Sequence, residues 1–320
     1  MNIENFISVD WGTSNFRMRL VEVPKLRVIE EITSSKGIKT IYNEWKETNE
    51  DRESYFLRFL QSQLTLFNEY INPSIKMIIS GMGSSGIGLR ELPYADIPFN
   101  TNGHSLFVDK IDSLIIPHPI YLISGVKSAT DVIRGEEVQI VGLLSDKDLE
   151  QTVLFILPGT HSKHMMAQKG MVTNFKTYMT GEIFQVIQQH TILKDSIEFG
   201  ELHEAELKSF EEGVLTATDG SSVLNSLFKI RTNTLFNEKT KTENFFYLSG
   251  LLIGDELKTL KTSDFDTLKL CAGGKLFDLY LKAIDILGLL SVSEVVERDI
   301  VDHSVIKGQW TTIKNNLNLN

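Results

Sequence analysis

The sequence contains a single cysteine, Cys271, so it can form no internal disulfide and has no CxxC pair for a metal or redox site. It also has no run of about 18 apolar residues, the length that a membrane-spanning helix needs. The chain starts MNIENFISVDWG, without the basic segment and apolar stretch of an export signal. We therefore expect a cytoplasmic protein with no membrane partner.

Clusters of lysine and arginine are absent too. The 32 basic and 42 acidic residues give a net charge of −10, which disfavours a nucleic acid as partner. An acidic protein can still bind phosphate groups through backbone N–H groups or a bridging cation. With 22 glycines and 7 prolines the chain is not of low complexity, and its 42% hydrophobic residues are enough for two domain cores.

The pattern of apolar residues predicts two α/β halves of similar order. The expected strands lie at residues 6–10, 16–20, 26–32, 75–80, 153–157, 171–179 and 267–271. The expected helices lie at residues 56–67, 129–144, 182–190, 202–210, 213–228, 243–261 and 275–287. This repetition predicts a duplicated α/β fold with a central cleft. We place the N-terminal domain at residues 1–148 and the C-terminal domain at residues 149–320.

The first strand of each half runs into a similar polar turn. Val-Asp-Trp-Gly-Thr-Ser-Asn at 9–15 is echoed by Leu-Pro-Gly-Thr-His-Ser-Lys at 157–163. Glycine and small hydroxyl residues at a hairpin tip let backbone N–H groups approach a phosphate, and Asp10 could then hold Mg²⁺. The alternative is an ordinary hairpin turn, with Asp10 as its first residue. The predicted phosphate-binding residues are Gly12, Thr13, Ser14, Asn15, Gly159, Thr160, His161, Ser162 and Lys163.

Two other glycine-rich segments do not fit nucleotide-binding motifs. Gly81 to Gly86 matches GxGxxG, but Pro93 and Pro98 prevent the helix that a Rossmann fingerprint must open. Gly273-Gly274-Lys275 lacks the upstream glycine and the Ser or Thr of a Walker motif. We therefore expect residues 81–86 to form a loop near a ligand, and we expect no P-loop.

Several segments together resemble the 2-dehydro-3-deoxygalactonokinase family, which belongs to the actin, Hsp70 and sugar kinase superfamily. They lie at residues 10–17, 81–82, 90–94, 134–137, 158–163, 179–182 and 248–254, in the family's order. The resemblance implies a ribonuclease H-like, actin-like ATPase fold. It also implies an ATP- and Mg²⁺-dependent kinase of carbohydrate catabolism that converts 2-dehydro-3-deoxy-D-galactonate to its 6-phosphate. The sequence departs from the family at Ala272–Leu276, where a small hydroxyl residue is expected, and in residues 298–320.

The resemblance also implies roles for particular residues. A carboxylate must orient or deprotonate the sugar hydroxyl, and Glu136 is the first choice for it. Glu137 is second, because neighbouring helical residues point about 100° apart, and Asp131 is third. The alternative is that Glu136 and Glu137 are solvated glutamates in the first turn of a helix.

The substrate is a keto acid, and an arginine fork suits its carboxylate. Arg90 is the preferred candidate, and a surface ion pair is the alternative. Thr180 is also predicted to be the N-cap of the next helix. The predicted substrate contacts are Gly81, Met82, Arg90, Glu91, Arg134, Thr180, Gly181 and Glu182, and the predicted adenosine contacts are Gly273, Gly274 and Lys275.

Two other functions remain as alternatives. On the same fold a glutamate could position water in a phosphatase acting on polyphosphate or a nucleotide, and the chain could instead be a non-enzymatic sensor of ATP or sugar. The presence of both Asp10 and Glu136 argues against a sensor. We expect the sugar acid and ATP as small-molecule partners, and the sequence leaves a homodimer open.

Overall fold

The structure is a computed structural model that describes residues 5–68 and 71–318, apart from the side chain of Lys275. The chain divides into two compact units. The first contains the described residues up to Glu150, together with Ala167–Asn174 and the described residues from Asp299 onward. The second contains Gln151–Met166 and Phe175–Arg298. The first unit thus includes two segments from the second half of the chain, and the domain boundary at residue 148 stays a prediction.

The first unit is built on a six-stranded sheet of order β3-β2-β1-β4-β8-β7. β1 pairs antiparallel with β2, and the central strands β1, β4 and β8 are parallel to one another. The apolar runs that the sequence shows at β1 and β4 are buried because parallel strands are covered on both faces. The strands are β1 (Asn5–Trp11), β2 (Phe16–Glu22), β3 (Arg27–Ser34), β4 (Lys76–Gly81), β7 (Val108–Ile111) and β8 (Ile120–Ile123).

Two helices, α1 (Ile38–Lys46) and α2 (Arg52–Leu64), pack against this sheet. The carboxylate of Asp51 caps α2 by accepting a hydrogen bond from Ser54 N at 2.9 Å. Trp11, expected in the turn, is the last residue of β1, and its ring packs against Phe56 and Phe59 of α2 at 5.6 and 5.4 Å. The end of β1 is therefore fixed by the core.

Two further helices of the first unit, α3 (Glu136–Leu143) and α9 (Arg298–Asn316), cross at two glycines. A Cβ at Gly142 would lie 1.8 Å from Ser304 O, and a Cβ at Gly308 would lie 1.8 Å from Val138 O. The helix predicted at 129–144 begins later than expected, at Glu136, because Gly135 has φ of +111° and residues 132–133 form a short strand. The sequence pattern did not predict α9.

The second unit contains a sheet whose strand order repeats that of the first. Its order is β15-β14-β11-β12-β13, and β11, β14 and β15 are parallel. The hairpin β11-β12-β13 thus corresponds to β1-β2-β3, which confirms the predicted duplicated α/β fold. The tip of the β12–β13 hairpin belongs to the first unit, where β13 pairs with β6. The strands are β11 (Thr152–Leu157), β12 (Ser162–Gln168), β13 (Met171–Tyr178), β14 (Thr267–Leu270) and β15 (Ser293–Val295).

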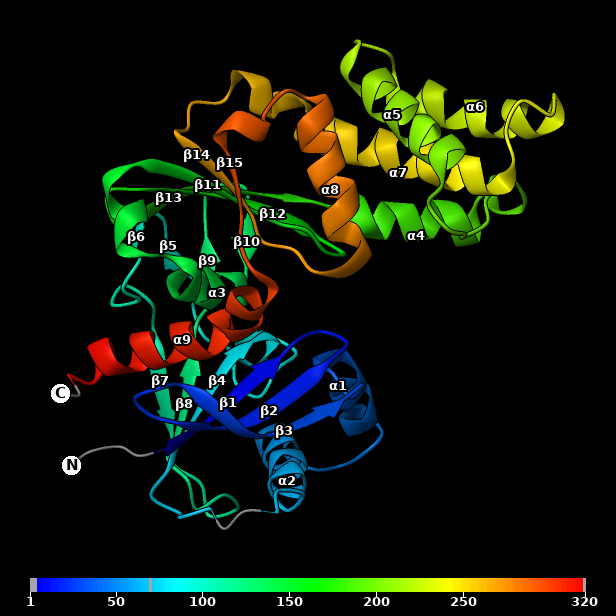
Figure 1. Cartoon of the computed structure of the whole chain (residues 1–320). Coiled ribbons are helices and arrows are strands. Elements are labelled where there is room, and N and C mark those ends of the chain that lie inside the picture. Colours follow the sequence, from blue (N-terminus) through cyan, green and yellow to red (C-terminus); the bar gives the residue numbers. More distant parts are fainter. Residues whose placement is uncertain (1–4, 69–70, 319–320) are drawn as a thin grey trace. The chain divides into compact units, whose positions relative to one another are not determined.

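The helices of the second unit gather around α7, which contacts α4, α5, α6 and α8 (Figure 1). The expected helices at 202–210 and 213–228 are wrong in their boundary, because α5 continues through residue 211. The break falls at Gly220, with φ of +90°, and Ser222 then caps α6. The helices are α4 (Thr180–His190), α5 (Glu204–Thr218), α6 (Val223–Leu235), α7 (Lys241–Leu257) and α8 (Gly274–Ile286).

Short elements complete the chain. They are the strands β5 (Ala95–Asp96), β6 (Phe99–Asn100), β9 (Val126–Lys127) and β10 (Val132–Ile133), and the single 3₁₀ turns η1 (Met82–Ser84), η2 (Asp146–Glu150), η3 (Lys194–Ser196), η4 (Lys258–Thr262) and η5 (Leu290–Val292). Within residues 5–68 and 71–318, no helix has the length and apolar character needed to span a bilayer.

Candidate active site

The β1–β2 turn of the first unit presents three exposed residues, Thr13, Ser14 and Asn15. Gly12 N donates to Asn15 O at 2.9 Å, and the carbonyl oxygens of Gly12 and Thr13 accept from the first N–H groups of α1 at 2.9 and 3.1 Å. A Cβ at Gly37 would lie 2.4 Å from Thr13 O, so the turn is packed directly on the start of α1. The predicted first phosphate turn is thus held by backbone contacts while its tip stays accessible.

Asp10 precedes this turn and is partly buried. Burial raises the pKa of its carboxyl group, Arg17 and Arg19 act to lower that pKa, and the charge of Glu136 raises it further. The interaction brings the two predicted catalytic carboxylates into one electrostatic environment. A hard divalent cation suits such a pair, because Mg²⁺ takes one or two carboxylates and fills its remaining positions with phosphate oxygens and water. No group of three metal-ligating side chains occurs within the described part of the chain.

Glu136 and Glu137 have different surroundings at the start of α3. Glu137 is fully buried, and both its oxygens accept from Gly135 N at 2.8 and 2.7 Å. Burial, reinforced by the charge of Glu136, raises the pKa of Glu137 to about 8. Glu136 is partly exposed, and one of its oxygens accepts from Arg134 N at 3.1 Å. Of the two, Glu136 is the carboxylate that solvent can reach.

The start of α3 lies beside the end of β4. A Cβ at Gly135 would lie 3.4 Å from Gly81 Cα, so the backbones of these two glycines lie close together. Gly81 itself has φ of +85° and would bring a Cβ to 2.8 Å from Trp11 O. Asp131, the third candidate base, lies in a loop rather than on the helix and accepts from Val132 N at 2.7 Å.

The two predicted substrate arginines differ in their partners. Arg90 bonds Glu53 with Nε and Nη2 at 2.9 and 2.7 Å, and its Nη1 bonds Asp109 at 2.7 Å. Arg134 Nη1 instead donates to Ser84 O and to Ser84 Oγ. Its guanidinium lies 4.2 Å from the ring of Tyr94. Arg90 therefore pairs with two carboxylates, whereas Arg134 bonds Ser84 and contacts Tyr94, and its charge acts to lower the pKa of Glu137.

Two other predicted substrate residues lie near Arg90 in the chain. Met82 begins the 3₁₀ turn η1 and is partly buried, and Glu91 is exposed. The carboxylate of Glu91 lies near Gly86, where a Cβ would be 3.4 Å from Glu91 Oε1. The GxGxxG segment forms η1 and a loop, as expected, and the next element along the chain is the strand β5.

In the second unit, the β11–β12 turn packs on the first turn of α4. Glu182 N donates to Thr160 O at 3.0 Å, and a Cβ at Gly181 would lie 2.6 Å from Gly159 O. His161 Nε2 lies 2.6 Å from Glu182 Oε2. The backbone of the turn is therefore packed directly against the start of α4.

Several side chains of this region point inward rather than to a ligand. Ser162 is fully buried and donates to Glu256 at 2.6 Å, so any contact of Ser162 with phosphate falls to its backbone. Lys163 is buried as well, and its Nζ donates to His161 O at 2.9 Å. Thr180 is not the N-cap of α4: that position is Met179, and the Thr180 hydroxyl donates to Glu256. Because the Thr180 hydroxyl donates to the buried Glu256 carboxylate, it does not cap the helix.

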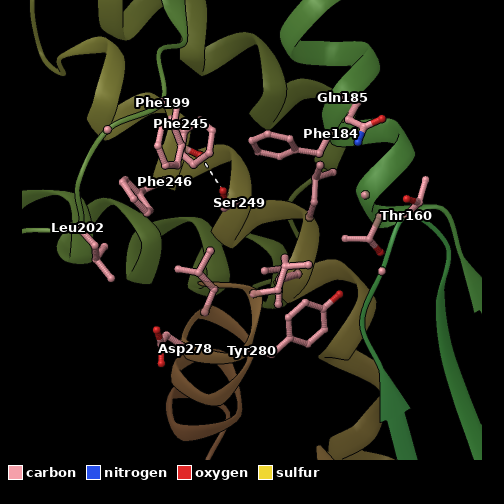
Figure 2. Close-up of a pocket in the computed structure, with 18 of the residues that line it drawn as sticks. Thr160, Phe184, Gln185, Phe199, Leu202, Phe245, Phe246, Ser249, Asp278 and Tyr280 are labelled. Atoms are coloured by element: carbon pink, nitrogen blue, oxygen red, sulfur yellow. Dashed lines mark hydrogen bonds between the residues drawn. The ribbon is translucent and has the colours of Figure 1, made fainter. Parts of the chain in front are cut away.

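A cavity of about 630 Å³ opens beside this turn, within the second unit (Figure 2). Phe199, Phe245 and Phe246 lie together on one side of it, and Thr160 lies on the opposite side (Figure 2). α8 contributes its residues 276, 278, 279 and 280 to the wall, rather than Gly273 and Gly274. Gly273 and Gly274 form the cap and first residue of α8, and the side chain of Lys275 lies outside the described residues. The sequence reasoning missed the aromatic wall because its residues come from a loop and from α7.

Comparison with known proteins identifies the family. Residues 10–310 match the family model of 2-keto-3-deoxy-galactonokinase. The chain belongs to this family. It is 25% identical over 291 residues to the 2-dehydro-3-deoxygalactonokinase of Escherichia coli (strain K12), an alignment that covers 88% of this chain and 90% of the relative. It also superposes, with a TM-score of 0.81 and 27% identity, on the crystal structure of a Sinorhizobium meliloti protein provisionally assigned as a 2-dehydro-3-deoxygalactonokinase, over 98% of each chain.

Family membership confirms the fold class and activity expected from the sequence. A 2-keto-3-deoxy-galactonokinase is a phosphotransferase of the actin-like ATPase and sugar kinase fold, and it uses ATP to phosphorylate a sugar acid. The alternatives of a phosphatase and of a non-enzymatic sensor are not favoured. All the site residues described above lie within the matched range of this galactonokinase family.

Proposed function

We propose that the protein transfers the γ-phosphoryl group of ATP to the 6-hydroxyl of 2-dehydro-3-deoxy-D-galactonate, with Mg²⁺ as cofactor. The observation that carries this proposal is the repeated turn, Gly12–Asn15 and Gly159–Ser162, at the same position in two sheets of the same order. Both turns have exposed residues at their tips, Thr13–Asn15 and Thr160–His161, where a phosphate could approach the backbone. The family match supports this reading, because the matched family is a kinase family.

The cavity of the second unit is our proposed site for the nucleotide. It lies within the range typical of small-molecule sites, and aromatic side chains form one side while the Gly159–Thr160 turn forms another. The adenine ring would pack against the phenyl rings, and the phosphates would extend towards the turn. In this placement Gly273 and Gly274 do not line the nucleotide site themselves. They lie at the start of α8, and later residues of that helix form part of the cavity wall.

Asp10 and Glu136 are the side chains that we propose take part in phosphoryl transfer. When bound, Mg²⁺ neutralises charge on the phosphates and orients them. Asp10 would bind the cation directly or through water. Glu136 would accept the proton of the sugar hydroxyl or orient it, since it is the exposed member of the glutamate pair. Glu137 would support the start of α3 by accepting from Gly135 N.

For the substrate carboxylate, the contacts favour Arg134 over Arg90. The three hydrogen bonds of Arg90 already go to Glu53 and Asp109, so a third carboxylate would meet net negative charge there. Arg134 carries its charge beside Ser84 and the ring of Tyr94, in the same segment as Glu136. A guanidinium held in this way can pair with an incoming carboxylate. Met82 and Glu91 would then border the sugar, and Thr180, Gly181 and Glu182 would support the phosphate end. A cytoplasmic location and a homodimer stay predictions.

The experiment is a kinase assay with a panel of 2-keto-3-deoxy sugar acids of different stereochemistry, with ATP and MgCl₂, and with mass spectrometry of the product. We expect formation of ADP that depends on the sugar acid, and a product that gains one phosphoryl group. Release of inorganic phosphate without a sugar product would point to a phosphatase instead. Binding of ATP without turnover on any acid would point to a sensor.

A further inference from the structure

Glu256 of α7 is a buried carboxylate that lies outside every predicted site. Only 2% of the residue is exposed. Its Oε1 accepts from Ser162 Oγ at 2.6 Å and from His164 Nε2 at 2.9 Å. Its Oε2 accepts from Tyr280 Oη at 2.7 Å and from the hydroxyl of Thr180. A single side chain therefore connects α7 to β12, α4 and α8.

These contacts favour the ionised form of the carboxyl group, because the hydroxyl groups of Ser162, Thr180 and Tyr280 all donate to it. Burial acts to raise the pKa of Glu256, but the hydrogen bonds from His164, Ser162 and Thr180, with the charge of His164, together hold that pKa below its usual value. A buried carboxylate that is satisfied in this way is costly to remove, since its donors are then left without an acceptor. The arrangement is thus built around the charge of Glu256.

Two of the donors to Glu256 lie next to the predicted phosphate turn and the start of α4. Ser162 is the first residue of β12 and directly follows the Gly159–His161 turn. Thr180 is the first residue of α4 and directly precedes Gly181, whose backbone packs on Gly159 and Thr160. Glu256 therefore holds the segments on either side of the contact between the turn and α4. Tyr280, its donor from α8, forms part of the cavity wall.

We propose that Glu256 is a positioning residue for nucleotide binding, which fixes the Gly159–Thr160 turn relative to the first turn of α4 and to Tyr280. Glu256 is not among the residues that line the cavity, so it acts on the nucleotide through Ser162, Thr180 and Tyr280. This inference rests on the proposed function, in which the turn receives the phosphates of ATP. The alternative is that the carboxylate only stabilises the second unit.

The decisive comparison is between Glu256→Gln and Asp148→Asn in the full-length protein. Asp148 is a matched control because it is a buried carboxylate in the other unit, where it accepts from Ser145 N and Ser145 Oγ at 2.9 and 2.7 Å. Gln keeps the shape of Glu256 but replaces one acceptor oxygen by a donor group. We expect Glu256→Gln to raise the Kd of ADP in calorimetry, and the KM of ATP, about tenfold, with the KM of the sugar acid within about twofold of wild type. Asp148→Asn should lower Tm without changing either nucleotide constant.

Double variants separate positioning from direct binding. Ser162→Ala should raise the KM of ATP in the wild-type background, and the same substitution should add little in a Glu256→Gln background, because Ser162 acts on the nucleotide through its contact with the Glu256 carboxylate. Full additivity would mean that Ser162 acts independently of Glu256, and would overturn the proposal. If Glu256→Gln does not fold, His164→Gln takes its place, since His164 also contacts the Glu256 carboxylate but, unlike Tyr280, does not line the cavity. A raised Kd of ADP in that variant supports the proposal, and an unchanged Kd overturns it.

The remaining outcomes are equally distinct. A Glu256→Gln protein with a lowered Tm and wild-type constants for ADP and ATP would show a purely structural carboxylate, and would leave the proposed kinase function untouched. A wild-type protein that neither binds ADP nor phosphorylates any acid would overturn the proposed function, and the positioning role of Glu256 with it.

Discussion

The backbone of Gly181 lies directly against Gly159, so closely that a Cβ at position 181 would come within 2.6 Å of Gly159 O and 2.8 Å of Thr160 Cα. Backbone atoms cannot yield as the end of a side chain can, so no larger residue fits without a shift of the turn. By contrast, a Cβ at Gly159 would have no heavy atom within 4 Å. The glycine at 181 is therefore required by packing, whereas packing sets no such requirement at position 159.

Gly181→Ala should displace the β11–β12 turn from α4 and weaken nucleotide binding. We expect an increase of about tenfold or more in the KM of ATP, with a smaller change in the KM of the sugar acid, because Gly181 lies in the second unit. Steady-state kinetics with each substrate varied in turn measures this split. Equal increases in both constants would show that the variant disturbs the whole protein rather than the turn.

Glu136→Gln should lower kcat by about a hundredfold while the Kd of ADP stays near the wild-type value, as expected when a base that acts in the transition state is lost. Glu137→Gln should have a much smaller effect on kcat, because Glu137 is fully buried and its oxygens accept from Gly135 N. Single-turnover kinetics of the two variants provides the comparison. A larger loss in Glu137→Gln would reverse the roles assigned to the pair.

Glu137 also predicts how stability depends on pH. Its pKa rises from 4.5 to about 8 on folding, so the folded protein binds this proton more tightly than the unfolded chain does. The corresponding contribution to the free energy of unfolding is fully present below pH 4.5 and is lost as the pH rises through about 8. Its slope cannot exceed about 1.4 kcal/mol per pH unit.

Urea unfolding of wild type and Glu137→Gln between pH 5 and pH 9 measures this contribution. Gln still accepts from Gly135 N but does not titrate. As the pH rises, the free energy of unfolding of the wild type should therefore fall relative to that of the variant. A gap that is constant with pH would mean that Glu137 titrates alike in the folded and unfolded states.

The two arginines make a matched pair of variants. Arg134→Ala should raise the KM of the sugar acid tenfold or more, by about 1.5 to 3 kcal/mol for a charge-assisted pair. Arg90→Ala should lower Tm and change that KM less, because it leaves the carboxylates of Glu53 and Asp109 without their shared cation. If Arg90→Ala has the larger effect on KM, the keto acid binds at Arg90, as sequence order first indicated.

Local patterns explain what the sequence predicted well. The buried runs at β1, β4 and β11 and the Gly-Thr turns are written in consecutive residues, so the repeated hairpin could be recognised. The helix α1 carries a clear apolar stripe, Ile38, Ile41, Tyr42 and Trp45, and was missed although the signal is present. α9 carries no such signal, because the face it buries includes Ser304, Gly308, Gln309 and Thr312. A polar and small-residue contact has no hydrophobic period to detect.

The candidate site shows the same limit. Asp10 and Glu136 follow from short motifs, but the partners that decide the state of a side chain come from distant residues. Arg90 meets Glu53 from α2, and Ser162 meets Glu256 from α7, pairs separated by 37 and 94 residues. Which charge is neutralised, and which hydroxyl points inward, follows from these tertiary contacts. Sequence therefore predicts candidate groups, whereas the contacts that bear on their roles are visible only in the folded structure.

Asp10→Asn tests the metal requirement, and Ser8→Ala on the same strand is its control. Ser8 lies two residues earlier on the same face of β1, and its buried hydroxyl has no hydrogen-bond partner within the described structure. An amide is a poor ligand for Mg²⁺ in place of a carboxylate, so Asp10→Asn should lower kcat/KM at least about a hundredfold and raise the MgCl₂ concentration needed for half-maximal rate. Because burial and Glu136 raise the pKa of Asp10, removing its charge should not destabilise the fold, and Tm should hold or increase. Ser8→Ala should keep the wild-type MgCl₂ dependence. An Asp10→Asn enzyme with that same dependence and near-normal turnover would place the cation on other ligands.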